Sequence, residues 1–328
     1  MVSSSAAHEA LAAALGARAR LMAPLGPLTT YGVGGPAAVL VEVEGPADLD
    51  VVRAALGASG EVAVFVLGRG SNLLVSDAGF DGVVLHLGTG FAGLDLPADG
   101  PTPGAVVRAG AALSLPVLAR RVADGGWSGL SWAVGVPGSV GGAVRMNAGG
   151  HGSDMAACLV RYSWVDVLGD DGGTHDVAHL AYGYRRSSVT ASQLVVAAEL
   201  AVTPGTAEVE REAVATIVKW RREHQPGGSN AGSVFTNPEG DSAGRLIEEA
   251  GLKGYRLGTA HVSEKHANFI QADKGGRADD VRALMEHVRA VVAARCGVTL
   301  SAEVRLLGFD GWKTGAVGAH GESGAGAA

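Results

Sequence analysis

A buried strand that runs directly into a glycine-rich turn most restricts the fold of this chain. Residues 62–67 form an uninterrupted apolar run, which is typical of a strand covered on both faces. The turn that follows at once is Gly68-Arg69-Gly70-Ser71-Asn72. Small residues in such a turn allow backbone N–H groups to converge on an anion. The pair predicts an α/β module with a phosphate-binding turn, or else a tight turn that binds nothing.

The turn does not complete the fingerprint of a dinucleotide-binding Rossmann unit. That fingerprint needs a glycine where this chain has Leu73, and a helix that begins there. The neighbouring elements still form a module over residues 21–87. We predict a strand over 38–43, a helix that ends at Gly57, and a strand over 83–87. Residues 1–20 are predicted to be a helical extension.

A second glycine-rich stretch lies at residues 135–143 and continues through residues 147–150. The whole segment 132–152 is predicted to be a loop between secondary-structure elements. Core packing does not require so many glycines in one surface stretch, and loops of this length are usually functional. Two such stretches predict a ligand with more than one phosphate held between domains. The alternative is a long flexible loop.

The rest of the chain divides into two predicted units. Residues 88–205 are rich in strands, and residues 206–308 are α+β. The predicted strands lie at 106–108, 162–167, 194–202 and 298–307. The predicted helices lie at 115–124, 207–224, 242–250 and 281–296. The glycine- and alanine-rich residues 309–328 are predicted to be a disordered tail.

Composition argues against several classes of function. The 328 residues carry a formal net charge of −7 with no long basic run, so sequence-independent nucleic-acid binding is not expected. No apolar run reaches the ~18 residues that span a bilayer, and no signal-peptide core is present. The two cysteines, Cys158 and Cys296, form no metal-ligand pattern, so no metal is predicted. We expect a cytoplasmic protein with no membrane or protein partner.

Three polar residues lie in segments that a purely structural role does not explain. They are Arg185 in the segment 184–187, Ser233 in the segment 231–238, and Glu303 in the last predicted strand. Each alone has an ordinary explanation: an arginine at a polar strand end, a serine in a turn, and a solvated strand glutamate. Together, a cation, a hydroxyl and a carboxyl are what a site needs to add hydride and a proton across a carbon–carbon bond conjugated to a carboxylate.

The ordered set of motifs resembles the UDP-N-acetylenolpyruvoylglucosamine reductase family of bacterial peptidoglycan synthesis. Each motif is weak alone, but the ordered set is specific. The segments that carry the resemblance are 29–37, 68–74, 135–143, 146–149, 184–187, 231–238, 243–248, 251–254, 263–270 and 303–304. Their compact spacing resembles the shorter subtype of the family, which lacks an extra substrate-clamping insertion.

The resemblance implies a vanillyl-alcohol-oxidase-like (PCMH-type) FAD-binding fold of the α+β class, with a C-terminal α+β substrate-binding domain. FAD would lie between residues 21–87 and 88–205, and residues 206–308 would close over a UDP-sugar. NADPH would reduce the flavin and leave before the substrate enters. The residues implied to bind FAD are Tyr31, Gly68, Arg69, Gly70, Ser71, Asn72, Leu73, Gly135, Val136, Pro137, Gly138, Ser139, Gly141, Gly142, Ala143, Asn147, Ala148 and Gly149.

The resemblance also implies roles for the three polar residues. Arg185 and Glu303 would stabilise negative charge that develops on the substrate carboxylate, and Ser233 would deliver the proton. Glu303 must then be protonated, so burial or a nearby carboxylate must raise its pKa. The residues implied to bind the substrate are Tyr184, Asn237, Lys265 and His266. This chain departs from the family at three positions: His224 and Thr236 replace common lysines, and Ala272 replaces a common asparagine.

Two rival functions remain open from the sequence. One is a flavin oxidase of the same fold that acts on a sugar or alcohol with O₂. Such oxidases often tether the flavin through His or Cys, and His151 lies beside the second glycine-rich stretch. The other is a nucleotide-sugar-binding protein with no redox role. Anaerobic bleaching by NADPH followed by re-oxidation by the enolpyruvyl sugar nucleotide separates the reductase from the oxidase. A colourless protein that takes up no FAD would indicate the binding protein.

Overall fold

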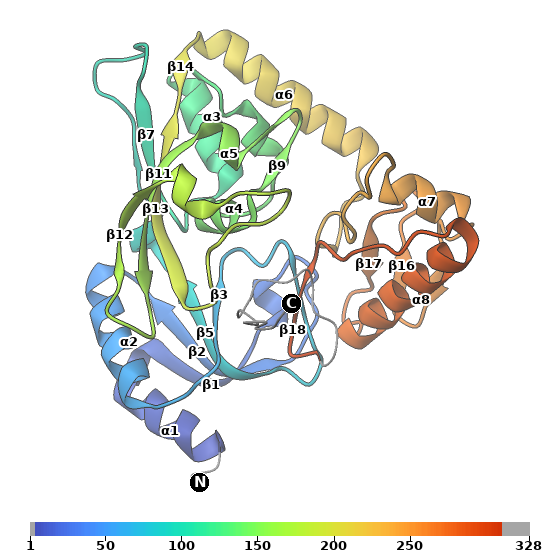
Figure 1. The fold of residues 1–328 in the computed structure, drawn as a ribbon, viewed down its shortest axis with the longest axis horizontal. Helices are drawn as coiled ribbons and strands as arrows, with labels where there is room; N and C mark the ends of the chain where they lie inside the picture. Colours follow the sequence, from blue (N-terminus) through green and yellow to red (C-terminus); the bar gives the residue numbers. More distant parts are fainter. Residues whose placement is uncertain (1–3, 310–328) are drawn as a thin grey trace, which may run out of the picture.

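The first sheet has the strand order β1-β2-β5-β3 in the computed structural model, which describes residues 4–309. β1 (Ala19–Pro24) runs antiparallel to β2 (Pro36–Val43), whereas β5 (Phe80–Leu87) is parallel to both β2 and β3 (Val64–Leu67). Helices α1 (Ser4–Leu15) and α2 (Pro46–Ala58) bury leucines and valines against this sheet (Figure 1). The predicted strand–helix–strand–strand module is thus confirmed.

The N-terminal helix is shorter than predicted. α1 ends at Leu15, and part of the remaining segment forms β1. β1 is an irregular edge strand, because Met22 has a φ of 49° and is 65% exposed. Without a clean apolar alternation, the strand had no visible sequence pattern. α2 also continues one residue past Gly57, which was predicted to end it.

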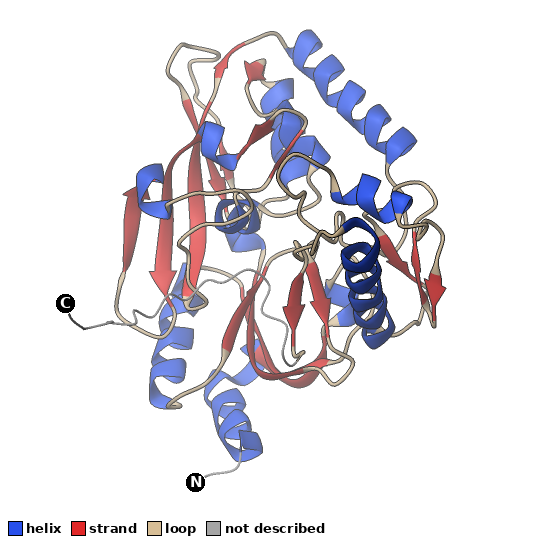
Figure 2. Cartoon of the chain, turned by 45° about the vertical axis from the view of Figure 1, so that its right-hand side comes forward, coloured by secondary structure: helices blue, strands red, loops and turns tan. Residues whose placement is uncertain are grey.

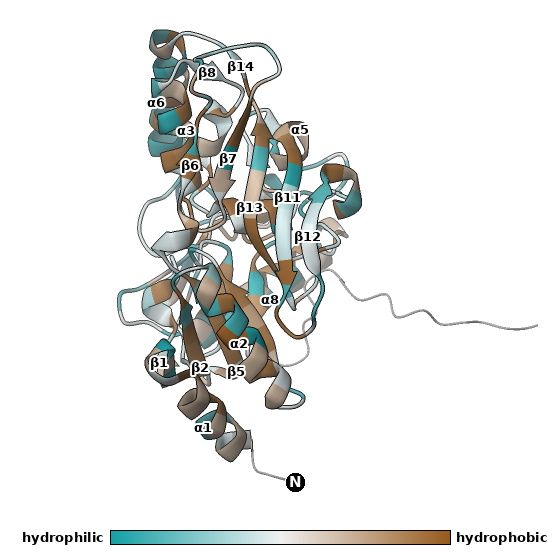
Figure 3. Ribbon diagram, turned by 90° about the vertical axis from the view of Figure 1, so that its left-hand side faces the viewer, coloured by the Kyte–Doolittle hydropathy of each residue, from teal (hydrophilic) through white to brown (hydrophobic). Residues whose placement is uncertain are grey.

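The second sheet is antiparallel, with the strand order β12-β11-β13-β7-β6. Its strands are β6 (Leu94–Asp95), β7 (Val106–Gly110), β11 (Leu159–Asp166), β12 (Gly172–Asp176) and β13 (Gln193–Ala201), which confirms the three predicted ones. α3 (Leu115–Asp124), α4 (Val140–Met146) and α5 (Met155–Cys158) cover one face. Figure 3 shows the sheet from its other side, where these helices do not cover it.

The segment 132–152 is not the loop that the sequence predicted. It contains most of a 3₁₀ turn (Ser131–Gly135), the helix α4, and strand β9 (Gly149–Gly150), which pairs with β10 (Ser153–Asp154). Two glycines in the seven residues of α4 hid the helix, since each costs about 1 kcal/mol relative to alanine. Tertiary packing overrides this cost: a Cβ on Gly141 would lie 2.9 Å from the Ala111 side chain.

The long helix α6 (Ala207–His224) packs against the second sheet's helices. It contacts α3, and its Val214 belongs to the same hydrophobic core. Before it, β14 (Thr203–Pro204) pairs with β8 (Trp127–Ser128) and turns the chain back. Figure 1 shows α6 running from there toward the C-terminal part of the chain. This packing favours a domain boundary after His224, and the predicted boundary at residues 205–206 stays a prediction.

Residues 225–309 form the C-terminal unit. Its elements are α7 (Ala243–Glu249), β15 (Arg256–Leu257), β16 (Ala260–Val262), β17 (Ile270–Ala272), α8 (Ala278–Cys296) and β18 (Arg305–Leu307). The predicted helical face of α8 is buried, and Gly297 ends the helix with a φ of 70°. The strand predicted over 298–307 is shorter: only Arg305–Leu307 form β18, and the residues before it make a single bridge, Phe235 to Ala302.

The C-terminal unit is joined to the first sheet's loops at several points. β18 pairs in parallel with β4 (Leu73–Val75), and Leu74 lies in the core of the C-terminal unit. Asp77 accepts hydrogen bonds from Ala278 N at 3.0 Å and Asp279 N at 3.2 Å, so it caps α8. Figure 2 brings this part of the molecule forward. The C-terminal unit is therefore held on the first sheet.

Of the predicted tail 309–328, residues 310–328 lie outside the described residues. Phe309 is described and packs against the core of the C-terminal unit, so it is not part of a disordered tail. Among the helices of residues 4–309, none has both the length and the apolar character needed to cross a membrane.

Candidate active site

A cavity of about 880 Å³ lies where the two sheets and the C-terminal unit meet. Its lining includes the turn after β3, the start of α4 and the segment before β18. All three residues predicted to be catalytic, Arg185, Ser233 and Glu303, line this cavity. A neighbouring cavity of about 560 Å³ shares part of the wall, including Arg69, Ser139 and Arg145. The two spaces together suit an elongated ligand.

The turn at residues 68–72 is shaped for an anion. Gly70 has a φ of 58°, and a Cβ there would overlap Leu28 O, so only glycine fits. A Cβ on Gly68 would lie 2.6 Å from Ser139 Oγ, so the two glycine-rich segments touch. Within the described chain, the backbone N–H groups of residues 69–72 donate no hydrogen bond. Free donors beside a cavity favour phosphate binding over a plain turn.

Arginines give the cavity a positive lining although the chain is acidic overall. Five arginines line it, against one carboxylate, Glu303: Arg69, Arg145, Arg185, Arg221 and Arg305. Burial lowers the pKa of Arg145 to about 10, with a smaller effect from the charge of Arg305. Burial also lowers the pKa values of Arg221 and Arg305. An anionic ligand offsets the cost of burying these cations.

Three of these arginines were missed from the sequence. Arg145 stands in a stretch predicted to be loop, Arg221 in a charged helix end, and Arg305 in an alternating strand. In such patterns an arginine is indistinguishable from one that faces water. No local signal could have assigned them to the cavity.

Arg185 and Glu303 form a close pair. Arg185 Nε lies 2.8 Å from Glu303 Oε1, although its N–H is not aligned as a hydrogen-bond donor to that oxygen. Burial raises the pKa of Glu303, and the Arg185 charge only partly offsets this effect. Of the two causes that the sequence left open, burial is therefore the one that acts, and it favours the protonated carboxyl.

The backbone of Arg185 is strained. Its φ of 57° is in the left-handed region, which residues other than glycine rarely adopt. Gly183 N donates to Arg186 O at 3.1 Å, and Arg186 N donates to Gly183 O at 3.2 Å, so a tight turn presents Arg185. Strain of this kind persists only where surrounding contacts impose it, and it is common at active sites.

The end of α4 imposes that turn. Three hydrogen bonds join them: Tyr182 Oη to Val144 O at 2.7 Å, Asn147 Nδ2 to Gly183 O at 3.2 Å, and Ser187 Oγ to Arg145 O at 2.6 Å. Asn147 itself does not line the cavity. The structure therefore gives this asparagine, predicted to bind FAD, a role in holding the Arg185 turn.

Ser233 and Glu303 are linked through their backbones. Glu303 N donates to Val234 O at 2.8 Å, directly after Ser233. On its other side, Glu303 O accepts a hydrogen bond from Asn72 Nδ2 at 3.1 Å. The predicted acid, the predicted proton donor and the first glycine-rich turn are thus connected.

With three exceptions, the residues predicted to bind FAD line the cavity. The exceptions are Tyr31, Gly141 and Asn147, and Gly141 lines the neighbouring cavity instead. Tyr31 is 0% exposed and belongs to the core of the C-terminal unit. Its ring fills the junction between that unit and the first sheet's loops, which the loop sequence around it did not indicate.

None of the four residues predicted to bind the substrate lines the cavity. Tyr184 is 61% exposed, with the Arg185 guanidinium 5.3 Å from its ring. Lys265 Nζ donates to Arg222 O, and His266 Nδ1 accepts from Asn268 N at 3.2 Å. These contacts occupy the side chains within the protein, so their substrate role stays a prediction.

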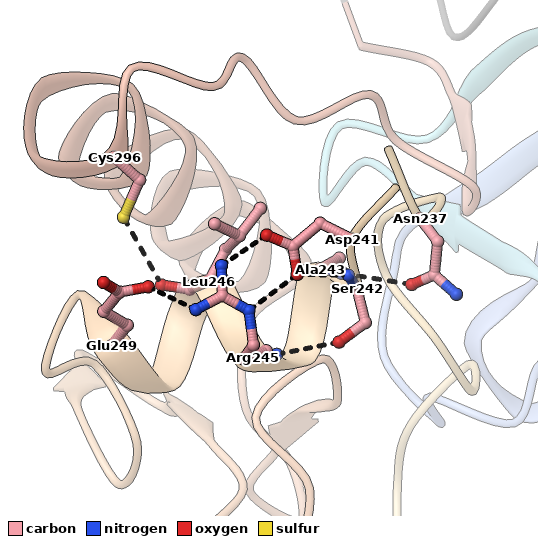
Figure 4. Close-up of polar contacts among 8 residues, drawn as sticks. All are labelled: Asn237, Asp241, Ser242, Ala243, Arg245, Leu246, Glu249 and Cys296. Atoms are coloured by element: carbon pink, nitrogen blue, oxygen red, sulfur yellow. Dashed lines mark hydrogen bonds and ion pairs between the residues drawn. The ribbon is translucent and has the colours of Figure 1, made fainter. Parts of the chain in front are cut away.

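Asn237 has a capping role in the structure. Its Oδ1 accepts a hydrogen bond from Ala243 N at 3.1 Å, at the start of α7 (Figure 4). Ser242 Oγ caps the same helix by accepting from Arg245 N at 3.2 Å, and Arg245 binds Asp241 and Glu249. Asn237 and Ser242 thus stabilise the start of α7.

The positions that depart from the family also lie outside the cavity lining. The His224 ring stacks on Trp220 with a centroid separation of 4.6 Å, and Thr236 Oγ1 donates to Ser301 O at 3.2 Å. His151, considered as a flavin tether, packs edge-on against the same Trp220 at 5.1 Å and does not line the cavity either.

Comparisons with known proteins show the family and the fold of this chain. A family model described as an FAD-binding domain matches residues 37–178, and one described as the UDP-N-acetylenolpyruvoylglucosamine reductase C-terminal domain matches residues 224–307. These matches confirm the predicted FAD-binding fold with a C-terminal α+β unit.

Whole-chain relatives point the same way. UDP-N-acetylenolpyruvoylglucosamine reductase 2 of Symbiobacterium thermophilum is 42% identical over 90% of this chain and 94% of its own length. The reductase of Acidiphilium cryptum is 40% identical over 87% of this chain and 90% of its own length. A crystal structure of the Thermus caldophilus reductase superposes with a TM-score of 0.73 at 35% identity, covering 88% of this chain and 98% of that one.

Proposed function

The chain belongs to the UDP-N-acetylenolpyruvoylglucosamine reductase family, and on this premise we propose that Arg185, Ser233 and Glu303 carry out its reaction. The enzyme is a flavoprotein oxidoreductase that uses FAD and NADPH. It reduces UDP-N-acetylenolpyruvoylglucosamine to UDP-N-acetylmuramate in peptidoglycan precursor synthesis. The observation that carries the residue assignment is the convergence of these three side chains on one positively lined cavity.

The protein's own residues fit FAD. The unpartnered N–H groups of residues 69–72 and the adjoining residues 135–139 would hold the pyrophosphate, and the two connected cavities offer length for both ends of the cofactor. When bound, FAD supplies to the terminal enolpyruvyl carbon the hydride that it has received from NADPH.

Arg185 and Glu303 act on the charge that hydride addition creates. As the hydride bonds to the terminal carbon, the electron pair of the double bond moves toward the substrate carboxylate. Arg185 offers a fixed planar cation, and protonated Glu303 offers an O–H donor. Both donors are preorganised by the protein, so they stabilise the transition state more than the ground state.

Ser233 completes the addition. Its hydroxyl proton passes to the carbon next to the carboxylate, where the electron pair then forms a C–H bond. Serine is a weak acid, so a neighbouring donor or water must restore its proton. The link from Val234 to Glu303 keeps the hydroxyl and the carboxyl on the same wall of the cavity.

The test separates the two halves of the reaction. We expect Ser233→Ala to leave flavin reduction by NADPH intact and to slow flavin re-oxidation by the enolpyruvyl substrate by ~10²-fold, as for loss of a general acid. Stopped-flow absorbance measures both rates. An equal loss in both half-reactions would contradict the role of Ser233. Re-oxidation by O₂ but not by the substrate would favour the oxidase instead.

We also propose a cytoplasmic location. NADPH and the UDP-sugar are charged nucleotides, and the cost of taking such charges into an apolar environment keeps them from crossing a bilayer unaided. Fractionation of the source cells checks this: activity in the membrane or extracellular fraction would contradict it.

A further inference from the structure

One buried asparagine satisfies both backbone groups of a residue close to Ser233. Asn268 is 3% exposed. Its Oδ1 accepts from Phe235 N at 3.0 Å, and its Nδ2 donates to Phe235 O at 2.8 Å. The amide thus replaces the two hydrogen bonds that a neighbouring strand would make. Phe235 cannot move relative to Asn268 without breaking both of them.

The backbone around this contact extends the restraint to Ser233. Val234 N donates to Asn268 O at 2.8 Å, and Val234 O accepts from Glu303 N at 2.8 Å. The residue next to Ser233 is therefore held between the segment that carries Asn268 and the segment that carries Glu303. Val234 and Phe235 are both buried, so their side chains anchor the chain as well.

The chain on the other side of Ser233 is less restrained. Gly232 has a φ of 76°, and a Cβ built there would meet no atom within 4 Å. Gly232 N donates one side-chain hydrogen bond, to Asn230 Oδ1 at 3.0 Å. The direction of the Ser233 hydroxyl is consequently set mainly from its C-terminal side, where Asn268 acts.

We propose that Asn268 is the positioning residue that aims Ser233 at the substrate carbon. The proposal rests on the proposed role of Ser233. Asn268 does not line the cavity, so it acts through the backbone of residues 234–235 rather than on the cofactor or substrate. A misplacement of about 1 Å can cost up to 10²-fold in rate, so two hydrogen bonds at this point can decide the proton transfer.

The first test uses Asn268→Ala in the flavin-loaded enzyme. We expect flavin re-oxidation by the enolpyruvyl substrate to slow by ~10-fold or more, while reduction by NADPH changes less than twofold. The control is Thr259→Ala in the same C-terminal unit, which removes a side chain that accepts from Arg277 N at 2.8 Å and does not line the cavity. The control should leave both rates unchanged. An equal loss in both half-reactions of N268A would overturn the proposal.

Asn268→Asp provides a rescue by the near-isosteric side chain. A protonated aspartic acid can accept from Phe235 N and donate to Phe235 O, whereas the carboxylate cannot donate. The ratio of N268D to wild-type re-oxidation rates should therefore rise as the pH falls. His266 is a titratable side chain in contact with this site, and burial lowers its pKa, so it stays neutral to a lower pH than an exposed histidine does. A pH-independent ratio would count against the proposal.

A double-mutant cycle covers the case in which the single variants are merely less stable. If Asn268 acts through Ser233, adding N268A to S233A should cause no further loss in re-oxidation. Additive losses would assign Asn268 a general structural role and overturn the proposal. The wild-type enzyme separates the two hypotheses: if its NADPH-reduced flavin is not re-oxidised by the enolpyruvyl substrate, the proposed function fails, independently of Asn268.

Discussion

Arg185 Nε and Glu303 Oε1 lie 2.8 Å apart, although one residue belongs to a turn anchored on α4 and the other to the segment that leads into β18. The pair places a permanent cation beside a carboxyl whose pKa burial has raised. A substrate carboxylate in the cavity would meet the Arg185 guanidinium and, at pH values where Glu303 is protonated, a second and neutral donor. Their separation in the chain makes the pair a product of the tertiary fold.

The pH dependence of re-oxidation should report Glu303. Because its pKa lies above the ordinary 4.5, the protonated fraction falls, and the rate with it, as the pH rises through that raised value. Glu303→Gln keeps an N–H donor at every pH, so we expect its rate to lack this alkaline decline, whereas Glu303→Ala, which removes the donor, should be slower by ~10²-fold. Stopped-flow rates across the pH range check it. The same decline in the glutamine variant would assign the titration to another group.

Stability should respond to the same carboxyl. A pKa raised in the folded state means that the protein loses stability as the pH rises from the unfolded pKa through the folded pKa, because ionisation is easier in the unfolded chain. The change in melting temperature that Glu303→Gln causes should therefore be more favourable at pH 8 than at pH 4. Thermal unfolding of the oxidised enzyme at both pH values measures this. A larger gain at pH 4 would contradict the direction.

Adjacent arginines provide a matched test of the cation. Arg185 lines the cavity, whereas Arg186 in the same turn is exposed and does not. We expect Arg185→Ala to slow re-oxidation by ~10²-fold and Arg186→Ala to leave it within twofold, since only the first removes a donor from developing charge. Comparable losses in the two variants would show that the turn, and not the guanidinium, is what matters.

Alanine substitutions at two glycines with similar φ angles can distinguish steric overlap from backbone strain. Gly70 and Gly60 have φ values of 58° and 77°, but only a Cβ at Gly70 would overlap the neighbouring backbone. Alanine costs about 1 kcal/mol of strain at either position. Only Gly70→Ala should also lower the bound flavin per protein, measured from the ratio of absorbance at 450 and 280 nm. Normal flavin content in G70A would show that flavin binding does not depend on the close packing of this turn.

Periodicity and turn chemistry were sufficient for much of the fold. The helices at 115–124, 207–224 and 281–296 follow from apolar residues at helical spacing, which is a local property of the chain. The helix α4 and the edge strand β1 could not be predicted in this way. Glycines conceal the first and an irregular conformation conceals the second, and in both cases contacts with distant segments decide the structure.

The candidate site also has features that could be predicted from the sequence and features that depend on tertiary packing. The sequence by itself indicated the two glycine-rich segments and named Arg185, Ser233 and Glu303 as candidates, because clustered glycines and the ordered motifs are local properties of the chain. Only the tertiary structure decided that Arg145, Arg221 and Arg305 line the cavity and that Tyr31, Asn147 and Asn237 lie outside its lining, in contact with other parts of the protein. Whether an arginine or asparagine meets ligand, protein or water depends on which segments fold against it, and that information is not local.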